Sequence, residues 1–196
     1  MTAHNVAILL FDDVEVLDFC GPFEVFSVTD AYNPVRPFNV YTVAEKTPIL
    51  ARNALSVNPT YLLDDARCPA PDLIVVPGGR GTRHAMHNAR LLEWIRERAQ
   101  RAQLTLSVCT GALMLARAGL LDGLAATTHH SALEELRAVA PNTIILPDQR
   151  VVDNGAVIVS AGISAGIDMA LHVVARLHGI ETARQTAAYM EYDWRA

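Results

Sequence analysis

The chain has 196 residues, of which 51% are hydrophobic and 19% charged, and its formal net charge is −5. These values describe a folded domain with a substantial core, and they argue against a disordered chain and against a general nucleic-acid binder, which needs a basic surface. Three widely spaced cysteines (Cys20, Cys68 and Cys109) form no disulfide framework and suit the reducing cytoplasm. The first residues lack a basic segment and the longest apolar stretch contains Arg117, so we expect neither a secretion signal nor a membrane span.

The first half of the chain predicts strands and helices in alternation. Continuous apolar runs are typical of strands covered on both faces, and proline suits a first helical turn, so Gly21-Pro22 is expected to open a helix. Asn88 precedes a segment with one apolar and one charged face, which predicts a capped helix. In chain order we expect a strand at 6–11, a helix at 21–25, strands at 38–43 and 72–77 with a small hairpin or edge element between them at 48–61, and a helix from 88 to 99.

The second half continues the alternation. Ser131 and Glu134 have the spacing of a capping box, and Asn154-Gly155 favours a type I′ hairpin turn. In chain order we expect a strand at 104–108, a helix at 110–121, a strand-like segment at 124–128, a helix at 131–139, a hairpin at 150–159, a small-residue loop at 160–166, and helices at 167–177 and 181–189. These elements predict a single α/β domain over residues 1–196, a flavodoxin-like sandwich with a mostly parallel sheet and helices on both faces.

Chemistry in such sheets gathers beyond the carboxyl ends of the strands. Cys109 stands there, between a buried strand and a small-residue helix whose dipole favours the nucleophilic thiolate. The loops after three other strand-like segments carry Asp18, the glycines of 78–81 and His129, and we expect all four loops to converge on the thiol. Three alternatives stay open: Cys109 as a packing residue, Asp18 as a helix cap and His129 as an ordinary loop histidine.

Four ordered motifs carry a family resemblance. They are Val-Leu-Asp18-Phe-Cys-Gly21-Pro22, Val-Pro77-Gly78-Gly79, Ser-Val-Cys109-Thr110-Gly111 and Ala-Thr-Thr-His129. The chain from about Val6 to Tyr192 resembles the ThiJ/PfpI superfamily, and within it the isocyanide hydratases and the sensor domain of certain AraC-type regulators.

The resemblance implies a nucleophile at Cys109, hydrogen-bonded to Asp18, with the amides of Thr110 and Gly79 lining an anion pocket. Ile163 matches a loop that closes over the site, and the usual state of these proteins is a homodimer. The implied activity adds water to a small electrophile, an isocyanide, and releases an N-substituted formamide through a thioimidate on Cys109, with no metal or organic cofactor. A cofactor-independent glyoxalase and a non-enzymatic redox or ligand sensor remain alternatives.

The chain also departs from its relatives. PfpI-type proteases carry His where Thr110 stands, and neither His172 nor His178 has the His-x-Glu spacing of class I glutaminases, which argues against a protease and an amidotransferase. His130 replaces an aromatic residue, which changes the pocket wall. We expect no Cys20–Cys109 disulfide and no zinc site at these residues, because the spacing fits no common ligand pattern. AraC-type relatives continue into helix-turn-helix domains, whereas this sequence ends at Ala196, so we expect no regulator of that kind.

Overall fold

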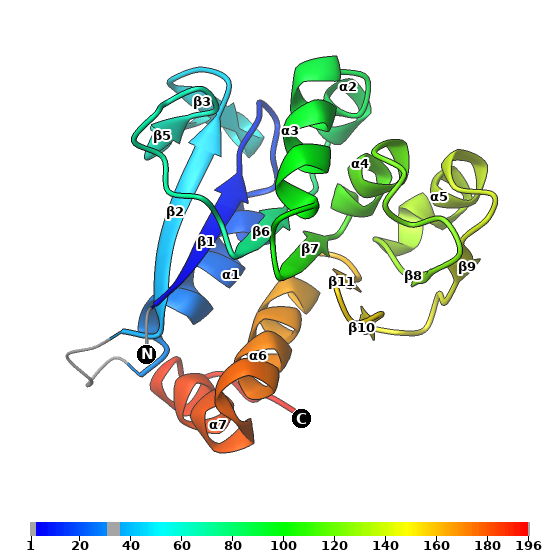
Figure 1. Ribbon diagram of the computed structural model, residues 1–196. Helices are drawn as coiled ribbons and strands as arrows, with labels where there is room; N and C mark the ends of the chain where they lie inside the picture. Colours follow the sequence, from blue (N-terminus) through cyan, green and yellow to red (C-terminus); the bar gives the residue numbers. More distant parts are fainter. Residues whose placement is uncertain (1–2, 31–35, 196) are drawn as a thin grey trace.

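A seven-stranded sheet lies at the centre of the molecule (Figure 1). The structure is a computed structural model that describes residues 3–30 and 36–195. Neighbouring strands are parallel, except for one antiparallel pair, β10 and β11, at one edge. In spatial order the strands are β10 (Val151–Asp153), β11 (Val157–Ser160), β7 (Leu104–Val108), β6 (Leu73–Val76), β1 (His4–Leu9), β2 (Phe38–Ala44) and β5 (Tyr61–Leu62). The predicted flavodoxin-like sandwich is therefore confirmed.

Helices cover both faces of this sheet, which explains why its inner strands are apolar throughout. All four residues of β6 are fully buried, as are Val6 to Leu9 of β1. Helices α1, α6 and α7 pack together on one face, while α3 and α4 pack on the other (Figure 1). The helices are α1 (Val16–Val28), α2 (Thr82–Ala85), α3 (Ala89–Ala99), α4 (Gly111–Arg117), α5 (Leu133–Val139), α6 (Ala165–His178) and α7 (Ile180–Tyr189). No helix within the described residues is both long and apolar enough to cross a membrane.

Two short strand pairs lie outside the central sheet. Strands β3 (Ile49–Ala51) and β4 (Leu55–Val57) form the antiparallel hairpin expected at 48–61. Strands β8 (Ala125–Ala126) and β9 (Ile144–Ile145) pair with each other, so the strand-like segment at 124–128 does not belong to the main sheet. Its end still reaches the expected site, because the Thr128 hydroxyl donates a hydrogen bond to the carbonyl of Cys109 at 2.8 Å.

The predicted start of α1 is wrong. The helix begins at Val16, and Pro22 lies inside it rather than in its first turn. Gly21 serves a different purpose, since a Cβ there would lie 3.0 Å from Cγ1 of Ile167 on α6. The glycine thus allows α1 and α6 to approach closely. Asp18 lies in the first turn of α1 and does not cap it, because the residue at the capping position is Glu15.

Three predicted boundaries or turns in the second half also differ. Helix α4 ends at Arg117 rather than Leu121, because Gly119 leaves the helix with a φ of +78°. The capping box at Ser131 is wrong, since its hydroxyl bonds to Nδ1 of His129 (2.8 Å) and α5 begins at Leu133 without a side-chain cap. The hairpin at 150–159 is confirmed, but only Gly155 of its turn has a positive φ, so the turn is not type I′. By contrast, the predicted cap at Asn88 is confirmed, because its side chain accepts hydrogen bonds from the amides of Arg90 and Leu91.

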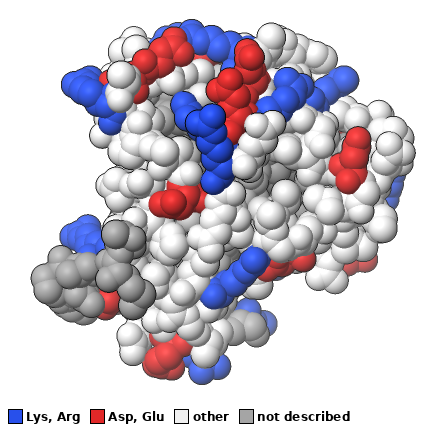
Figure 2. Space-filling model, in the orientation of Figure 1, with Lys and Arg blue, Asp and Glu red and all other residues white. Residues whose placement is uncertain are grey.

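Charged side chains of both signs are interspersed on the face shown in Figure 2, with broad uncharged areas between them. Such a surface presents no single-sign stripe on that face. The cleft that contains Cys109 is lined by residues that follow β1, β6, β7, β8 and β11, beyond the carboxyl ends of these strands.

Candidate active site

Cys109 occupies a sharp bend between β7 and α4. Its φ is +57°, a left-handed conformation that a residue with a Cβ adopts only at a cost of about 1–3 kcal/mol. Hydrogen bonds to distant residues hold it there: its amide donates to the carbonyls of Ser160 (3.2 Å) and Ala161 (3.1 Å), and its carbonyl accepts the Thr128 hydroxyl. Gly111 completes the bend, since a Cβ there would lie 2.0 Å from the carbonyl oxygen of Val76. The run Cys-Thr-Gly therefore fits this junction, and Cys109 as a whole residue is only 5% exposed.

Asp18 is the carboxyl group beside that thiol. It is completely buried, and its Oδ2 accepts the amide of Gly78 at 3.0 Å. Its Oδ1 is buried and has no hydrogen-bond partner among the described residues. The Cys109 thiol and the Ile163 amide lie close enough to this carboxyl group to lower its pKa. Burial raises the pKa of Asp18 to about 7, and the nearby charge of Glu15 adds to the rise.

The thiol itself is harder to ionise than the sequence indicated. Burial raises the pKa of Cys109 to about 12, and the charge of Asp18 is the second cause. The amides of Thr110 and Ile163 lower it, but α4 has only seven residues and its dipole does not outweigh the loss of water. Burial therefore opposes the effect of the helix dipole and favours the neutral thiol, beside a carboxyl group whose raised pKa lies near neutral pH.

Thr110 and Gly79 contact each other, but their two amides do not both line an anion pocket as expected. The Gly79 amide donates to Oγ1 of Thr110 at 2.9 Å, in a buried contact, and so does not face an open pocket. Of the two amides of Thr110 and Gly79, only that of Thr110 lowers the pKa of the Cys109 thiol. Glycine is required in this turn, because a Cβ on Gly78 would lie 2.5 Å from the Thr110 amide nitrogen and 2.8 Å from Oδ2 of Asp18.

Ile163 and His129 form the opposite wall. Ile163 has a φ of +52°, and its amide acts on both Cys109 and Asp18, so the loop predicted to close over the site does contact the pair. His129 accepts the amide of Ser131 at Nδ1 (3.3 Å), which leaves Nε2 as the protonated nitrogen of the neutral ring. Burial lowers the pKa of His129, with smaller effects from His130 and Arg83, so the ring is neutral at neutral pH.

These residues surround a small cleft of about 120 Å³. Cys109, Thr110, Gly79, Ile163 and His129 line it, as the sequence predicted for the site. The lining also includes Glu15, from the loop after β1, and three residues to which the sequence assigned no role in the site: Arg80, Arg83 and Ser131.

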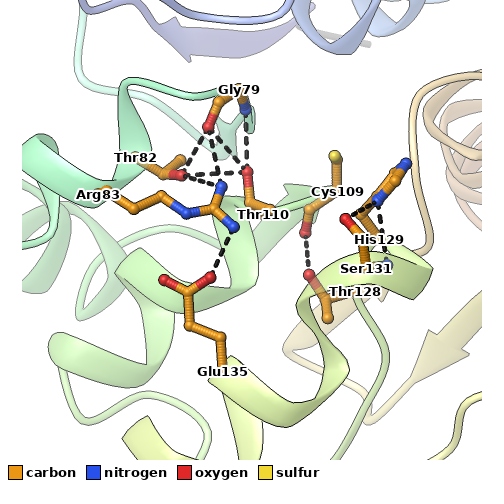
Figure 3. A network of polar contacts seen from close by, with 9 residues as sticks. All are labelled: Gly79, Thr82, Arg83, Cys109, Thr110, Thr128, His129, Ser131 and Glu135. Atoms are coloured by element: carbon orange, nitrogen blue, oxygen red, sulfur yellow. Dashed lines mark hydrogen bonds and ion pairs between the residues drawn. The ribbon is translucent and has the colours of Figure 1, made fainter.

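Arg83 makes several polar contacts beside the cleft (Figure 3). Its guanidinium forms an ion pair with Glu135 of α5 (2.6 Å) and also lies 3.4 Å from the Gly79 carbonyl. The Thr82 hydroxyl donates to the same carbonyl at 2.7 Å. The position of Arg83 four residues after Gly79, on the short helix α2, is the only signal in the sequence for its contact with the Gly79 carbonyl.

The remaining cysteines take no part in this cluster. Cys20 is exposed on α1, Cys68 is partly buried, and all three cysteines are free thiols. Within residues 3–30 and 36–195, no group of three or more His, Cys, Asp or Glu side chains is placed to hold a metal ion.

Comparisons with known proteins identify the family of this chain. The model of the DJ-1/PfpI family matches residues 4–176. The isonitrile hydratase of Pseudomonas putida is 37% identical over 195 residues, which cover 97% of this chain and 79% of that protein. The transcriptional regulator CdhR of Pseudomonas aeruginosa is 31% identical over 84% of this chain, and the matched part spans 51% of the regulator. Among solved structures, a ThiJ/PfpI family protein from Pseudomonas syringae has a TM-score of 0.87 and 31% identity, covering 100% of this chain and 78% of that one.

Proposed function

Since this chain belongs to the DJ-1/PfpI family, we propose that it acts as a cysteine-dependent isocyanide hydratase, adding water to an isocyanide to give an N-substituted formamide. The observation that carries the proposal is the pair formed by the Cys109 thiol and a buried Asp18 whose pKa is raised to about 7. A base with a pKa near the working pH is best suited to accept a proton from a thiol and return it to the substrate. The similarity to an isonitrile hydratase supports the choice of substrate.

In the first step, Sγ of Cys109 attacks the terminal carbon of the isocyanide. The thiol proton passes to the Asp18 carboxylate and then to that carbon, so a new S–C bond and a new C–H bond give a thioimidate, R–N=CH–S–Cys. Protonation of Asp18 removes the negative charge that opposes thiolate formation. The amides of Thr110 and Ile163 stabilise the charge on sulfur, each by about 1.5–3 kcal/mol for a hydrogen bond to a charged group.

In the second step, water adds to the thioimidate carbon and one of its protons goes to nitrogen. The C–S bond then breaks, the hydroxyl proton returns through Asp18 to sulfur, and the products are R–NH–CHO and the free thiol. The sum is one isocyanide and one water consumed for one formamide. No residue other than Asp18 is needed to carry protons, and His129, neutral on the opposite wall, contacts the substrate.

The burial of Cys109 argues against a redox sensor. Oxidation of a cysteine follows its thiolate content and its exposure, and Cys109 is a 5% exposed residue whose thiol has a raised pKa. A cofactor-independent glyoxalase uses the same kind of thiol and is distinguished by substrate.

We also propose that the chain, as one domain over residues 1–196, works in the cytoplasm as a homodimer. Three exposed leucines support the dimer: Leu17 on α1, and Leu50 and Leu55 on the β3–β4 hairpin. The hairpin is joined to the loop before α1, because the amide of Asp13 donates to the Leu50 carbonyl (2.8 Å). Exposed apolar side chains on two joined elements are typical of a protein interface.

Light scattering tests the dimer. Leu55→Glu should give a monomer at micromolar concentration, whereas Ile144→Glu, at a still more exposed isoleucine on β9, should remain a dimer. A monomeric wild-type protein would refute the dimer without affecting the hydratase.

The hydratase is tested with purified protein and phenyl isocyanide, with N-phenylformamide measured by chromatography. We expect turnover by the wild type, none by Cys109→Ser, and wild-type turnover by Cys20→Ser, which changes an exposed thiol outside the cleft. Formamide production by Cys109→Ser would overturn the nucleophile. Lactate from methylglyoxal without any formamide would establish the glyoxalase instead, and a sulfinic Cys109 after peroxide, with neither substrate consumed, would favour the sensor.

A further inference from the structure

The backbone of Ile163 is strained and is not held by packing. A β-branched residue with a φ of +52° costs about 1–3 kcal/mol, and such a conformation persists only where its surroundings impose it. Ile163 is a 37% exposed residue, so burial does not impose this backbone conformation. Something else must hold the loop that carries this amide.

Arg150, just before β10, bonds to both flanks of Ile163. On one side, its carbonyl accepts the amide of Ala161 at 2.9 Å. On the other side, its guanidinium lies 3.4 Å from the Ser164 hydroxyl, and its Nε donates to the Asp168 carboxylate at 2.7 Å. The segment from Ala161 to Ser164 is thereby fixed at both ends by one residue.

The Asp168 carboxylate, which binds the Arg150 guanidinium, is itself fixed by a hydrogen bond. Oδ1 of Asp168, in the first turn of α6, accepts the hydroxyl of Tyr192 at 3.0 Å. The guanidinium of Arg150 is therefore oriented by Asp168, whose own position is fixed by Tyr192, and not only by its contact with the loop. A charged hydrogen bond between a guanidinium and a carboxylate is stronger than a neutral one.

The same loop touches the reacting groups. The Ala161 carbonyl accepts the amide of Cys109 at 3.1 Å, and the Ile163 amide acts on both the Cys109 thiol and the Asp18 carboxyl group. We propose that Arg150 is a positioning residue, which acts with Asp168 and Tyr192 to hold the Ile163 amide against the thiol of Cys109. This inference rests on the proposed function only in that Cys109 is the reacting group.

The contribution of this ion pair to folding is small, which separates positioning from stability. The Arg150 side chain is 56% exposed and that of Asp168 18%, and exposed pairs typically add no more than about 1 kcal/mol. A variant that loses the guanidinium should therefore fold. It should also release the loop, weaken the amide contact to sulfur and make the thiol harder to ionise.

The experiment measures alkylation of Cys109 by iodoacetamide across a pH series, with the Cys109 peptide followed by mass spectrometry. Arg150→Met should slow alkylation at least about threefold at pH 8 and move the pH profile upward, since half a pKa unit changes the thiolate fraction about threefold. Arg150→Lys, which keeps the charge but not the planar fork, should recover part of the rate. The groups that face the pair, Asp18, Glu15, His129, Arg80 and Arg83, are the same in all variants.

The matched control is Arg176→Met. It removes an arginine that pairs with Asp153 at 3.0 Å and lies on the same helix as Asp168, but away from the loop. It should leave the alkylation rate and its pH profile unchanged, while melting temperatures of the two methionine variants should agree. Asp168→Asn, which keeps an acceptor for Tyr192, should slow alkylation in the same direction as Arg150→Met.

Wild-type alkylation by Arg150→Met, or a loss no larger than that of Arg176→Met, would overturn the proposal. If Arg150→Met does not fold, the wild-type rate in Asp168→Asn would overturn it equally. Alkylation needs no isocyanide, so failure of the hydratase assay and failure of this proposal are separate results.

Discussion

The side-chain hydroxyl of Thr110 accepts a hydrogen bond from the backbone amide of Gly79 at 2.9 Å. The contact is buried and joins the loop after β6 to the start of α4. It also removes the Gly79 amide from the groups that face the substrate. Thr110 therefore holds the two loops together with its side chain, and stabilises charge on sulfur with its amide.

This relationship predicts a large difference between two substitutions of Thr110. Thr110→Val keeps the shape of the side chain but leaves the buried amide of Gly79 without a partner, which should lower the free energy of unfolding by about 1–3 kcal/mol. Thr110→Ser keeps the hydroxyl and should lose much less. Urea unfolding measures both, and equal stabilities for the two variants would show that the hydrogen bond adds nothing.

Asp18 should make stability depend on pH. Folding raises its pKa from the ordinary value of 3.8 to about 7, so between these values the folded protein holds a proton that the unfolded chain has released. Stability should therefore fall as the pH rises from about 4 to about 7, by at most about 4 kcal/mol. Asp18→Asn cannot ionise and should lack this fall. Urea unfolding of both proteins at about pH 5 and about pH 8 tests this, and a constant difference between them would contradict it.

Asp18→Asn should also separate the ionisation of the thiol from turnover. The negative charge of Asp18 raises the pKa of Cys109, so its removal should lower that pKa and speed alkylation by iodoacetamide. The same change removes the proton carrier and should lower kcat for phenyl isocyanide by about 10²–10⁴-fold. Opposite effects on the two rates support a proton-transfer role, whereas a parallel fall in both would indicate damage to the site.

Gly162 predicts a steric coupling across the cleft. A Cβ on Gly162 would lie 2.2 Å from Cδ2 of His129, far inside contact distance. Gly162→Ala should therefore displace the loop and slow alkylation of Cys109. His129→Ala removes the ring, so the double variant should recover alkylation relative to Gly162→Ala alone. Additive effects of the two substitutions would show that the ring and the loop do not press on each other.

Much of this site can be predicted from the sequence, because the patterns that indicate it lie within a few neighbouring residues. An apolar strand followed by Cys-Thr-Gly predicts the bend at Cys109, and Pro77-Gly78-Gly79 predicts the turn beside it. Both depend on backbone geometry within a few residues. The order of apolar segments likewise predicts the parallel sheet, because a strand buried on both faces has a distinct pattern.

The rest depends on contacts between distant residues. Gly21-Pro22 has the pattern of a helix start, but Gly21 is needed for the approach of Ile167, which is far away in the chain. Arg83 and Glu135 are separated by 52 positions, and nothing near either one indicates the pair. The helix dipole favours the thiolate, whereas burial, which the folded structure shows, raises the pKa of Cys109.

The most direct test of the proposed chemistry is to trap the thioimidate. Wild-type protein is mixed with phenyl isocyanide, quenched at short times, and the peptide that contains Cys109 is analysed by mass spectrometry. We expect a transient increase by the mass of one isocyanide molecule on Cys109, formed and lost at rates consistent with formamide production, and no adduct on Cys20. Formamide released at the full rate without any adduct on Cys109, and equally by Cys109→Ser, would contradict covalent catalysis by this thiol.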